Sequence, residues 1–357
     1  MPRVQEGSFP SEAHGGVRIR TKAWLPDGLG ADRLRAKVAS PPSAVVLWSH
    51  GLHEHLGRFE KLYEALVEKN VAVYAWDHVG HGESGSCGPK RHQFPNGFDA
   101  VVHDALQFAR LVQSKYPKDT NERPPVPIFV GGVSFGGLVA AHVCSNAVKY
   151  GVSVAGCVLV APCCDVEWTP ALRVQASIGS FLAKVAPDFR GAAAVTPERL
   201  SSDVVAIEEY RRDPLVRVAN VRFKAAVEIM KGFEALRLDA FFDDNHFGNT
   251  PLLVMHGTND AACHFPASAA FVKRALSSDK TFRAIENGSH LLLHDSSTAA
   301  TTRDEICVFV RSRAEAFTKS SHSLGPRVAS DSVGRALHAS RQGAVTEAAE
   351  TDIGARL

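Results

Sequence analysis

Gly132-Val133-Ser134-Phe135-Gly136 is the stretch of this sequence that decides the fold. It matches the pattern G-x-S-x-G and stands between a β-branched apolar run at residues 127–132 and an apolar segment that continues to residue 147. The pattern is typical of a sharp strand-to-helix turn, in which glycines let the backbone pack closely while the serine is held toward solvent. The pentapeptide alone is a weak signal, because an ordinary turn serine can match it. Its position between a predicted strand and a predicted helix makes Ser134 a candidate nucleophile.

Strands and helices are predicted to alternate on both sides of this turn, from the spacing of the apolar residues. The predicted strands are residues 44–48, 71–76, 127–132, 154–161, 251–255 and 281–285. The predicted helices are residues 58–70, 98–116, 136–147, 267–275 and 301–317. This alternation predicts an α/β fold in which a mostly parallel central sheet is flanked by helices on both faces.

The alternation is interrupted between residues 163 and 250. No convincing strand is predicted there, whereas residues 171–185 and 221–236 look helical, so we predict an inserted helical lid. The tail is rich in Ser, Ala, Gly and Arg and is expected to be disordered, because it has few bulky apolar residues to bury. The predicted organisation is a core in two parts, residues 1–162 and 251–318, a lid at residues 163–250, and a tail at residues 319–357.

Composition excludes several classes of protein. The chain has 357 residues, of which 45% are hydrophobic and 22% charged, as in ordinary globular proteins. Its 40 Lys and Arg against 38 Asp and Glu are too balanced for a protein that grips nucleic acid. No apolar run is long enough to span a membrane, and the N-terminus has no apolar segment typical of a secretory signal. Seven cysteines without C-x-x-C spacing favour neither a disulfide framework nor structural zinc, so a reducing, intracellular compartment is expected.

A serine nucleophile needs a base that is oriented by a carboxylate, and in this kind of fold the three follow in the order Ser, Asp, His. Asp260 and His290 each come a few residues after a predicted strand, so both are expected at the same edge of the sheet as Ser134. Asp260 could instead cap the following helix, and His290 could be an ordinary surface histidine. His264 is too near Asp260 in the chain to be a good rival, and His294 comes a helical turn later.

Two backbone N–H groups are expected to face the oxyanion of a tetrahedral intermediate. One belongs to Phe135, the residue after the candidate nucleophile. The other is expected at Leu52, at the end of the loop Ser49-His50-Gly51-Leu52. This chemistry needs no cofactor and no metal.

With these residues in place, the chain resembles the monoacylglycerol lipase and lysophospholipase group of the α/β-hydrolases, over roughly residues 9–317. The motifs that carry the resemblance are W-S-H-G-L-H-E-H-L-G-R-F at residues 48–59, D-H-V-G-H-G-E-S at 77–84, Y-R-R-D-P-L at 210–215 and H-G-T-N-D at 256–260. The resemblance implies an α/β-hydrolase fold and a serine carboxylester hydrolase. It implies that the acyl ester of a monoacylglycerol or lysophospholipid is cleaved through an acyl-enzyme intermediate.

The resemblance also implies that Glu54 and Arg58 bind substrate, because their counterparts in monoacylglycerol lipases help to hold the glycerol hydroxyls. A structural ion pair at the start of a helix is an equally good interpretation. Leu293 stands where animal lipases have a second histidine, and Cys263 stands where the animal enzyme also has a cysteine. The alternatives within the fold are a thioesterase, a short-chain carboxylesterase and an aminopeptidase. A non-catalytic binding protein of the same fold is less favoured, because the candidate triad is complete.

The resemblance favours a cytoplasmic enzyme that contacts membranes peripherally through the lid. The apolar residues of the first lid helix recur at helical spacing, so they could line an acyl tunnel, rest on a membrane or pack on the core. They are Val174, Ile178, Phe181, Leu182 and Val185. The last three residues, Ala355-Arg356-Leu357, resemble the peroxisomal signal S-K-L, which makes a peroxisomal address the alternative. The oligomeric state is not predicted.

Overall fold

The computed structural model describes residues 2–27, 41–89, 91–92, 94–117, 125–168, 170–192, 195–243 and 247–323. The signal-like end Ala355-Arg356-Leu357 and residues 324–357 of the predicted tail lie outside the described residues.

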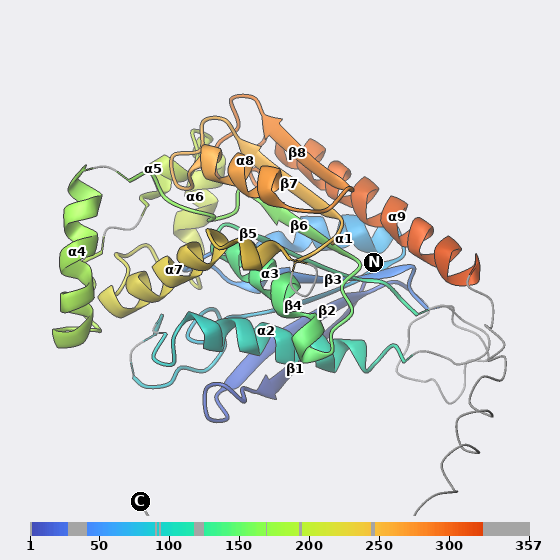
Figure 1. The fold of residues 1–357 in the computed structure, drawn as a ribbon, viewed down its shortest axis with the longest axis horizontal. Helices are drawn as coiled ribbons and strands as arrows, with labels where there is room; N and C mark the ends of the chain where they lie inside the picture. Colours follow the sequence, from blue (N-terminus) through green and yellow to red (C-terminus); the bar gives the residue numbers. More distant parts are fainter. Residues whose placement is uncertain are drawn as a thin grey trace, which may run out of the picture.

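In the described part of the chain, eight strands form one sheet (Figure 1). They are β1 (Arg3–Pro10), β2 (Arg18–Leu25), β3 (Ala44–Ser49), β4 (Val71–Trp76), β5 (Ile128–Val133), β6 (Gly156–Val160), β7 (Leu252–Gly257) and β8 (Lys280–Ile285). Their order across the sheet is β1-β2-β4-β3-β5-β6-β7-β8. The pairs from β4 to β8 are parallel, and β1 and β2 add an antiparallel edge. The predicted mostly parallel sheet is confirmed.

The strands β3 to β7 are buried along their whole length. Parallel strands that helices cover on both faces have no solvent side, and for this reason they occur in the sequence as continuous apolar runs. The strands β1 and β2 were not predicted. Most residues of β1 are partly or fully exposed, and Phe9 is its one buried residue, so its sequence lacks an apolar pattern.

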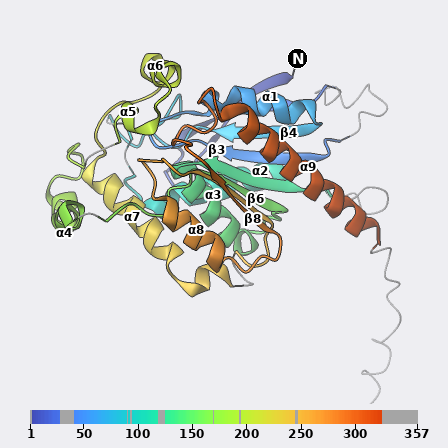
Figure 2. The ribbon, with the colours of Figure 1, turned by 90° about the horizontal axis from the view of Figure 1, so that it is seen from above.

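Five helices flank the sheet: α1 (Glu60–Glu68), α2 (Phe98–Gln113), α3 (Phe135–Asn146), α8 (Phe265–Arg274) and α9 (Ala299–Ser323). Figure 2 shows α1 and α9 on one face and α3 and α8 on the other. Each face has its own apolar core, one with residues of α1 and α9 and one with residues of α2, α3 and α8. The helix α9 extends past both ends of the segment predicted for it, residues 301–317. Short 3₁₀ helices lie at Leu56–Phe59, Val148–Tyr150 and Asp239–Phe242.

Between β6 and β7 the chain forms α4 (Pro170–Val185), α5 (Pro197–Leu200), α6 (Val204–Arg212) and α7 (Phe223–Leu236). We call this segment the insertion. The helices α4 and α7 occupy the two stretches predicted to be helical, whereas α5 and α6 were not predicted. Figures 1 and 2 show α4 at the outer end of the molecule, and α4 packs on α7, which in turn packs on α2 and α3. Within the described residues of the insertion, strand-like pairing is limited to one bridge, between Ala192 and Val221.

None of the described helices is both long enough and apolar enough to cross a lipid bilayer.

Candidate active site

Ser134 occupies the sharp turn between β5 and α3. Its φ angle is 54°, in the left-handed region that non-glycine residues rarely adopt. A Cβ atom on Gly136 would lie 2.2 Å from the carbonyl oxygen of Ser49, and one on Gly132 would lie 2.4 Å from the carbonyl oxygen of Gly136. Such close backbone approach requires glycine on both sides of the serine. The strand-to-helix turn that the motif predicts is therefore present.

Asp260 and His290 come together beside this turn. The Nδ1 atom of His290 lies 2.8 Å from the Oδ2 atom of Asp260, and both side chains are almost completely buried. The Oδ1 atom of Asp260 accepts hydrogen bonds from the backbone N–H groups of Ala262 and Cys263, at 2.7 and 2.9 Å. These bonds fix the carboxylate and leave Oδ2 facing two imidazoles, that of His290 and that of His256, whose Nε2 atom lies 3.0 Å away. The residue that precedes α8 is His264, so Asp260 does not cap that helix.

The electrostatics of this pair are strongly coupled. Burial alone would lower the pKa of His290 and raise that of Asp260, because it disfavours both charged forms. The attraction between the two groups outweighs burial in each case. It raises the pKa of His290 above its usual value and, with the help of His256, holds the pKa of Asp260 far below its usual range. The pair is therefore suited to stabilise a proton on the imidazole.

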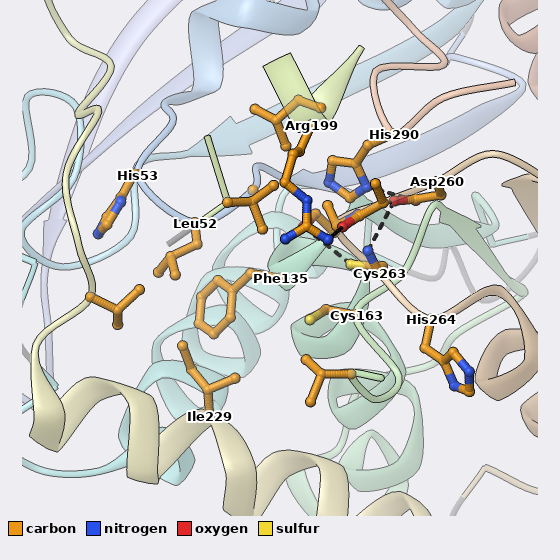
Figure 3. Close-up of a pocket in the computed structure, with 18 of the residues that line it drawn as sticks. Leu52, His53, Phe135, Cys163, Arg199, Ile229, Asp260, Cys263, His264 and His290 are labelled. Carbon is orange, nitrogen blue, oxygen red and sulfur yellow. Dashed lines mark hydrogen bonds and ion pairs between the residues drawn. The ribbon is translucent and has the colours of Figure 1, made fainter. Parts of the chain in front are cut away.

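The hydroxyl of Ser134 has a different neighbour in this structure. Its Oγ atom lies 3.8 Å from the Sγ atom of Cys263, and no hydrogen bond joins it to His290. Catalytic hydrogen bonds are often long before substrate binds, so the separation leaves His290 a candidate base. A hydrogen bond with Cys163, together with burial, raises the pKa of the Cys263 thiol well above its usual value. Figure 3 shows Cys263 near Asp260, with Cys163 beside Cys263.

Leu52 and Phe135 lie beside Ser134. The register of β3 on β5 pairs Ser49 with Gly132, which brings the loop after β3 beside the turn. A Cβ atom on Gly51 would lie 3.6 Å from the Cβ atom of Ser134. Phe135 is the first residue of α3, so the helix does not use its N–H group. Both residues lie beside the candidate nucleophile, and the use of their N–H groups as an oxyanion hole stays a prediction.

Glu54 and Arg58 form a buried ion pair, with 3.0 Å between Oε1 and Nε. Glu54 also accepts a hydrogen bond from the N–H group of Gly51, and Arg58 lies 3.6 Å from Asp213 in the loop after α6. The structural interpretation of the pair is thus realised, although Glu54 also lines the pocket described below. The Nε2 atom of His294 hydrogen-bonds the carbonyl oxygen of Arg58 at 3.0 Å, so its ring is already engaged.

A pocket of about 1340 Å³ opens above these residues. Ser134, Asp260 and His290 line it together with Leu52 and Phe135. Its apolar walls come largely from the insertion and include Ile178, Leu182, Ile229, Met230 and Phe233. Figure 3 shows Ile229 and Phe135 facing the cavity from neighbouring elements. The pocket has the concave, mostly apolar character that an acyl chain needs.

The insertion is hydrogen-bonded to the loops of the site at two places. The N–H group of Arg217 donates to the carbonyl oxygen of His53, next to Leu52, at 3.0 Å. The N–H groups of His290 and Leu291 donate to the carbonyl oxygen of Leu200 in α5, at 3.0 and 3.2 Å. The loop that carries Leu52 and the candidate base His290 are therefore both hydrogen-bonded to the insertion.

Some residues that line the pocket were not predicted from the sequence: His53, Cys163, Arg199 and Arg217. The two arginines lie in the insertion. The pattern of apolar residues there predicts helices, but it does not predict where those helices pack on the core. The positive φ angle of His53, 65°, has no signal in the local sequence, because glycine is the usual residue there.

Comparison with known proteins decides the family. Residues 40–297 match the family model described as serine aminopeptidase, S33. The chain belongs to this family. It is a serine hydrolase of the carboxylesterase type within the α/β-hydrolase superfamily, and it is monoglyceride lipase-like.

Several curated members of the superfamily align with most of the chain. A monoglyceride lipase from Mus musculus is 28% identical over 262 residues, which cover 72% of this chain and 78% of that protein. A monoacylglycerol lipase from Mycolicibacterium smegmatis is 26% identical over 272 residues, covering 74% and 83%. An uncharacterized abhydrolase domain-containing protein from Dictyostelium discoideum is 30% identical over 253 residues. These residues make up 70% of this chain but only 24% of that longer protein.

Solved structures show the same fold. A soluble variant of monoglyceride lipase from Saccharomyces cerevisiae superposes with a TM-score of 0.71 at 18% identity, covering 87% of this chain and 96% of that one. A monoacylglycerol lipase from Paleococcus ferrophilus superposes with a TM-score of 0.60 at 21% identity, covering 87% and 99%. The predicted α/β-hydrolase fold is confirmed.

Proposed function

We propose that this serine hydrolase cleaves the acyl ester of single-chain glycerolipids, monoacylglycerols or lysophospholipids. The observation that carries the proposal is the 2.8 Å contact between Asp260 and His290 at the wall of an apolar pocket that also contains Ser134. The names of the curated relatives, monoglyceride lipases among them, support the substrate class.

In the proposed reaction the Oγ atom of Ser134 attacks the ester carbonyl carbon while His290 takes the hydroxyl proton. Asp260 orients the imidazole and stabilises its charged form. The N–H groups of Leu52 and Phe135 donate to the oxyanion. The carbon–oxygen ester bond then breaks, and the leaving alcohol takes the proton from His290. Water hydrolyses the acyl-enzyme by the same route and releases the fatty acid, so the cycle uses no cofactor.

Labelling with a fluorophosphonate probe tests the nucleophile, and release of oleate from monooleoylglycerol tests the substrate. We expect the wild-type chain to be labelled and active, and the Ser134→Ala variant to be neither. Ser312→Ala, which removes an exposed serine of α9, is the matched control and should behave as wild type. Labelling that persists in Ser134→Ala would refute the assignment. Faster turnover of an acyl-CoA thioester or of an aminoacyl anilide than of monooleoylglycerol would favour the thioesterase or aminopeptidase alternative.

We further propose that residues 163–250 form a lid domain whose outer surface rests on membranes. The support is the exposure of Val174, Phe181 and Val185 on α4, with Phe189 just beyond its end. We expect Phe181→Glu to weaken binding to phosphatidylglycerol vesicles in a sedimentation assay. Val148→Glu, at an equally exposed apolar residue outside the insertion, is the control and should bind as wild type. Equal binding by wild type and Phe181→Glu would remove this surface from the proposal.

A further inference from the structure

Three arginines of the insertion lie near His53, in the loop that carries Leu52. Arg217 lines the pocket, and its backbone N–H group donates to the carbonyl oxygen of His53 at 3.0 Å. The ring of His92 packs against that of His53 with 4.9 Å between the centroids, and a guanidinium nitrogen of Arg190 lies 3.5 Å from the Nδ1 atom of His92. Arg222 donates to the carbonyl oxygen of Arg91, the residue before His92, at 3.0 Å. We call Arg190, Arg217 and Arg222 the arginine cluster.

No member of the arginine cluster forms an ion pair with a described residue. Arg190 donates to the carbonyl oxygen of Asn220 at 2.8 Å, and Arg222, which is buried, donates to carbonyl oxygens of Arg91 and Asp188. Carbonyl oxygens satisfy hydrogen bonds but do not neutralise charge. Arg217 is exposed, Arg190 is partly buried and Arg222 is buried. A buried charge without a counter-ion is costly, so an anion bound at the arginine cluster would stabilise it.

Three described residues of the pocket lining carry carboxylates, and two of them are already paired. Glu54 is paired with Arg58, and Asp260 is paired with His290. Glu167 is a further carboxylate of the lining, and it forms no ion pair with any described residue. Arg199 adds another positive charge to the wall, where it donates to the carbonyl oxygen of Ala261 at 2.9 Å.

The position of the arginine cluster suits one kind of ligand. In the proposed function the ester carbonyl oxygen lies at the amide of Leu52, and His53 is the next residue. In a single-chain glycerophospholipid the phosphate is separated from the ester carbonyl by only the glycerol carbons and two ester oxygens. A substrate bound with its carbonyl at Leu52 can therefore reach Arg217 with its phosphate.

We propose that the arginine cluster binds the phosphate of a lysophospholipid, so that an acyl glycerophosphate is a better substrate than a neutral monoacylglycerol. Guanidinium groups suit this task, because their planar N–H pairs match phosphate oxygens in bidentate contacts. A headgroup that carries its own cation, such as choline, is bound less tightly, because the cluster repels it. The inference rests on the proposed function, since it uses the same pocket and the same ester cleavage.

A binding experiment tests the cluster without depending on catalysis. The ligands are 1-O-octylglycerol 3-phosphate and uncharged 1-O-octylglycerol, both ethers that cannot be hydrolysed, and calorimetry is done on the full chain. We expect the phosphate ligand to bind at least about 10-fold more tightly, with a preference that falls as salt is added. Arg217→Gln should abolish most of the preference. Arg211→Gln is the matched control, because Arg211 is paired with Glu198 on the insertion and does not line the pocket.

Several results of this experiment would overturn the inference. Equal affinity of the wild-type chain for both ethers is one, and an unchanged preference in Arg217→Gln is another. Tight binding of inorganic phosphate with no gain from the octyl chain would indicate a free-phosphate site and would overturn the substrate assignment. Thermal melting of each variant shows whether it is folded. If Arg217→Gln does not fold, Arg190→Gln replaces it in the same experiment.

Kinetics separate the failure of this inference from the failure of the proposed function. The comparison is kcat/KM for 1-oleoyl glycerol 3-phosphate, for the corresponding choline ester and for monooleoylglycerol. We expect the phosphate monoester to be preferred, and Arg217→Gln to lower that preference about 10-fold, mainly through KM. Equal turnover of all three would leave the proposed function standing and the inference wrong. Phosphate-selective binding without hydrolysis of any of them would support the phosphate site and refute the proposed function.

Discussion

The parallel strands bury their apolar residues, whereas the first helix of the insertion exposes several of its own. Every residue of β3 to β7 is buried, whereas on α4 the side chains of Val174, Phe181 and Val185 are 60%, 64% and 61% exposed. In the strands, an apolar residue is there because it packs in the core. In the insertion, an apolar residue can face the pocket or solvent. Packing in the core therefore determines which residues the strands can have, whereas the ligand and the surroundings of the protein determine which residues the insertion can have. The following predictions test this division, from the largest expected effect to the smallest.

Substitutions at the carboxyl ends of the parallel strands should reduce catalysis most. We expect Asp260→Asn to lower kcat by about 10,000-fold, because the amide can neither stabilise the imidazolium nor hold the correct tautomer. Wild-type activity should rise as the pH rises through the elevated pKa of His290, since only the neutral imidazole accepts a proton. In the variant this inflection should move to lower pH. The measurement is kcat/KM for p-nitrophenyl butyrate between pH 5 and pH 10.

The matched control for this prediction is Asp239→Asn. Asp239 follows the insertion helices, is fully exposed and pairs with Arg274. It should keep wild-type activity and an unchanged pH profile. Near wild-type turnover in a folded Asp260→Asn variant would show that Asp260 is not the orienting acid.

The loops at the same edge should make the fold sensitive to acid. Five histidines pack against one another there: His50, His53, His78, His81 and His92. Burial lowers the pKa of every one, to about 3 for three of them (His50, His53 and His81). The unfolded chain therefore binds more protons below pH 6.5, and stability is lost as the pH falls from there toward 3. Between pH 7 and pH 5.5 each histidine should cost about 1 kcal/mol.

Guanidinium chloride unfolding at pH 7 and pH 5.5 measures this loss. We expect His92→Gln to lose about 1 kcal/mol less than wild type over that interval, because glutamine does not titrate. Comparison with wild type removes the contribution of His290, whose elevated pKa has the opposite sign and stabilises the fold at low pH. His264→Gln, outside the histidine group, is the control. A loss in His92→Gln as large as in wild type would contradict the prediction.

Glycines should respond differently in the two regions. A Cβ atom on Gly136 would meet the backbone oxygens of Ser49 and His50 at 2.2 and 2.4 Å, and those atoms cannot move aside without shifting β3. We expect Gly136→Ala to destabilise the fold by about 3 kcal/mol. Gly179, within α4, has open space around its Cβ position, so Gly179→Ala should stabilise the protein by about 0.5–1 kcal/mol. Urea unfolding measures the free energy of unfolding of both variants. Changes of the same sign and similar size would contradict the expected difference between the two regions.

The sequence predicted the part of the molecule in which burial decides the structure. The strands from β3 to β7 and their helices follow from apolar runs and helical spacing, whereas β8 was predicted although none of its residues is buried. The expected closeness of Asp260 and His290 follows from strand ends that share one edge. The hairpin of β1 and β2 was missed because its ladder is made by backbone groups, while most side chains of β1 are polar and exposed. No local pattern encodes such pairing.

The contacts of the insertion were also beyond prediction. The arginine cluster comes from separate stretches of the insertion, and its members come together through contacts with His92, Arg91 and His53 of the core. The pairing of Asp213 with His55, at 2.8 Å, joins two motifs that the sequence identified separately. Motif matching located both residues, but only the fold determines that they meet.

The hydrogen bonds from Arg217 to His53 and from His290 to Leu200 have a consequence for engineering and for descent. An inserted segment that contacts the core only at its two ends can be exchanged between related proteins without other changes. This segment also supports the loops that carry Leu52 and the candidate base His290, so a grafted insertion would lack the matching partners for them. Chimaeras should keep their activity when residues 49–58 and 286–295 travel with the insertion. Natural relatives should likewise exchange the three segments together rather than one at a time.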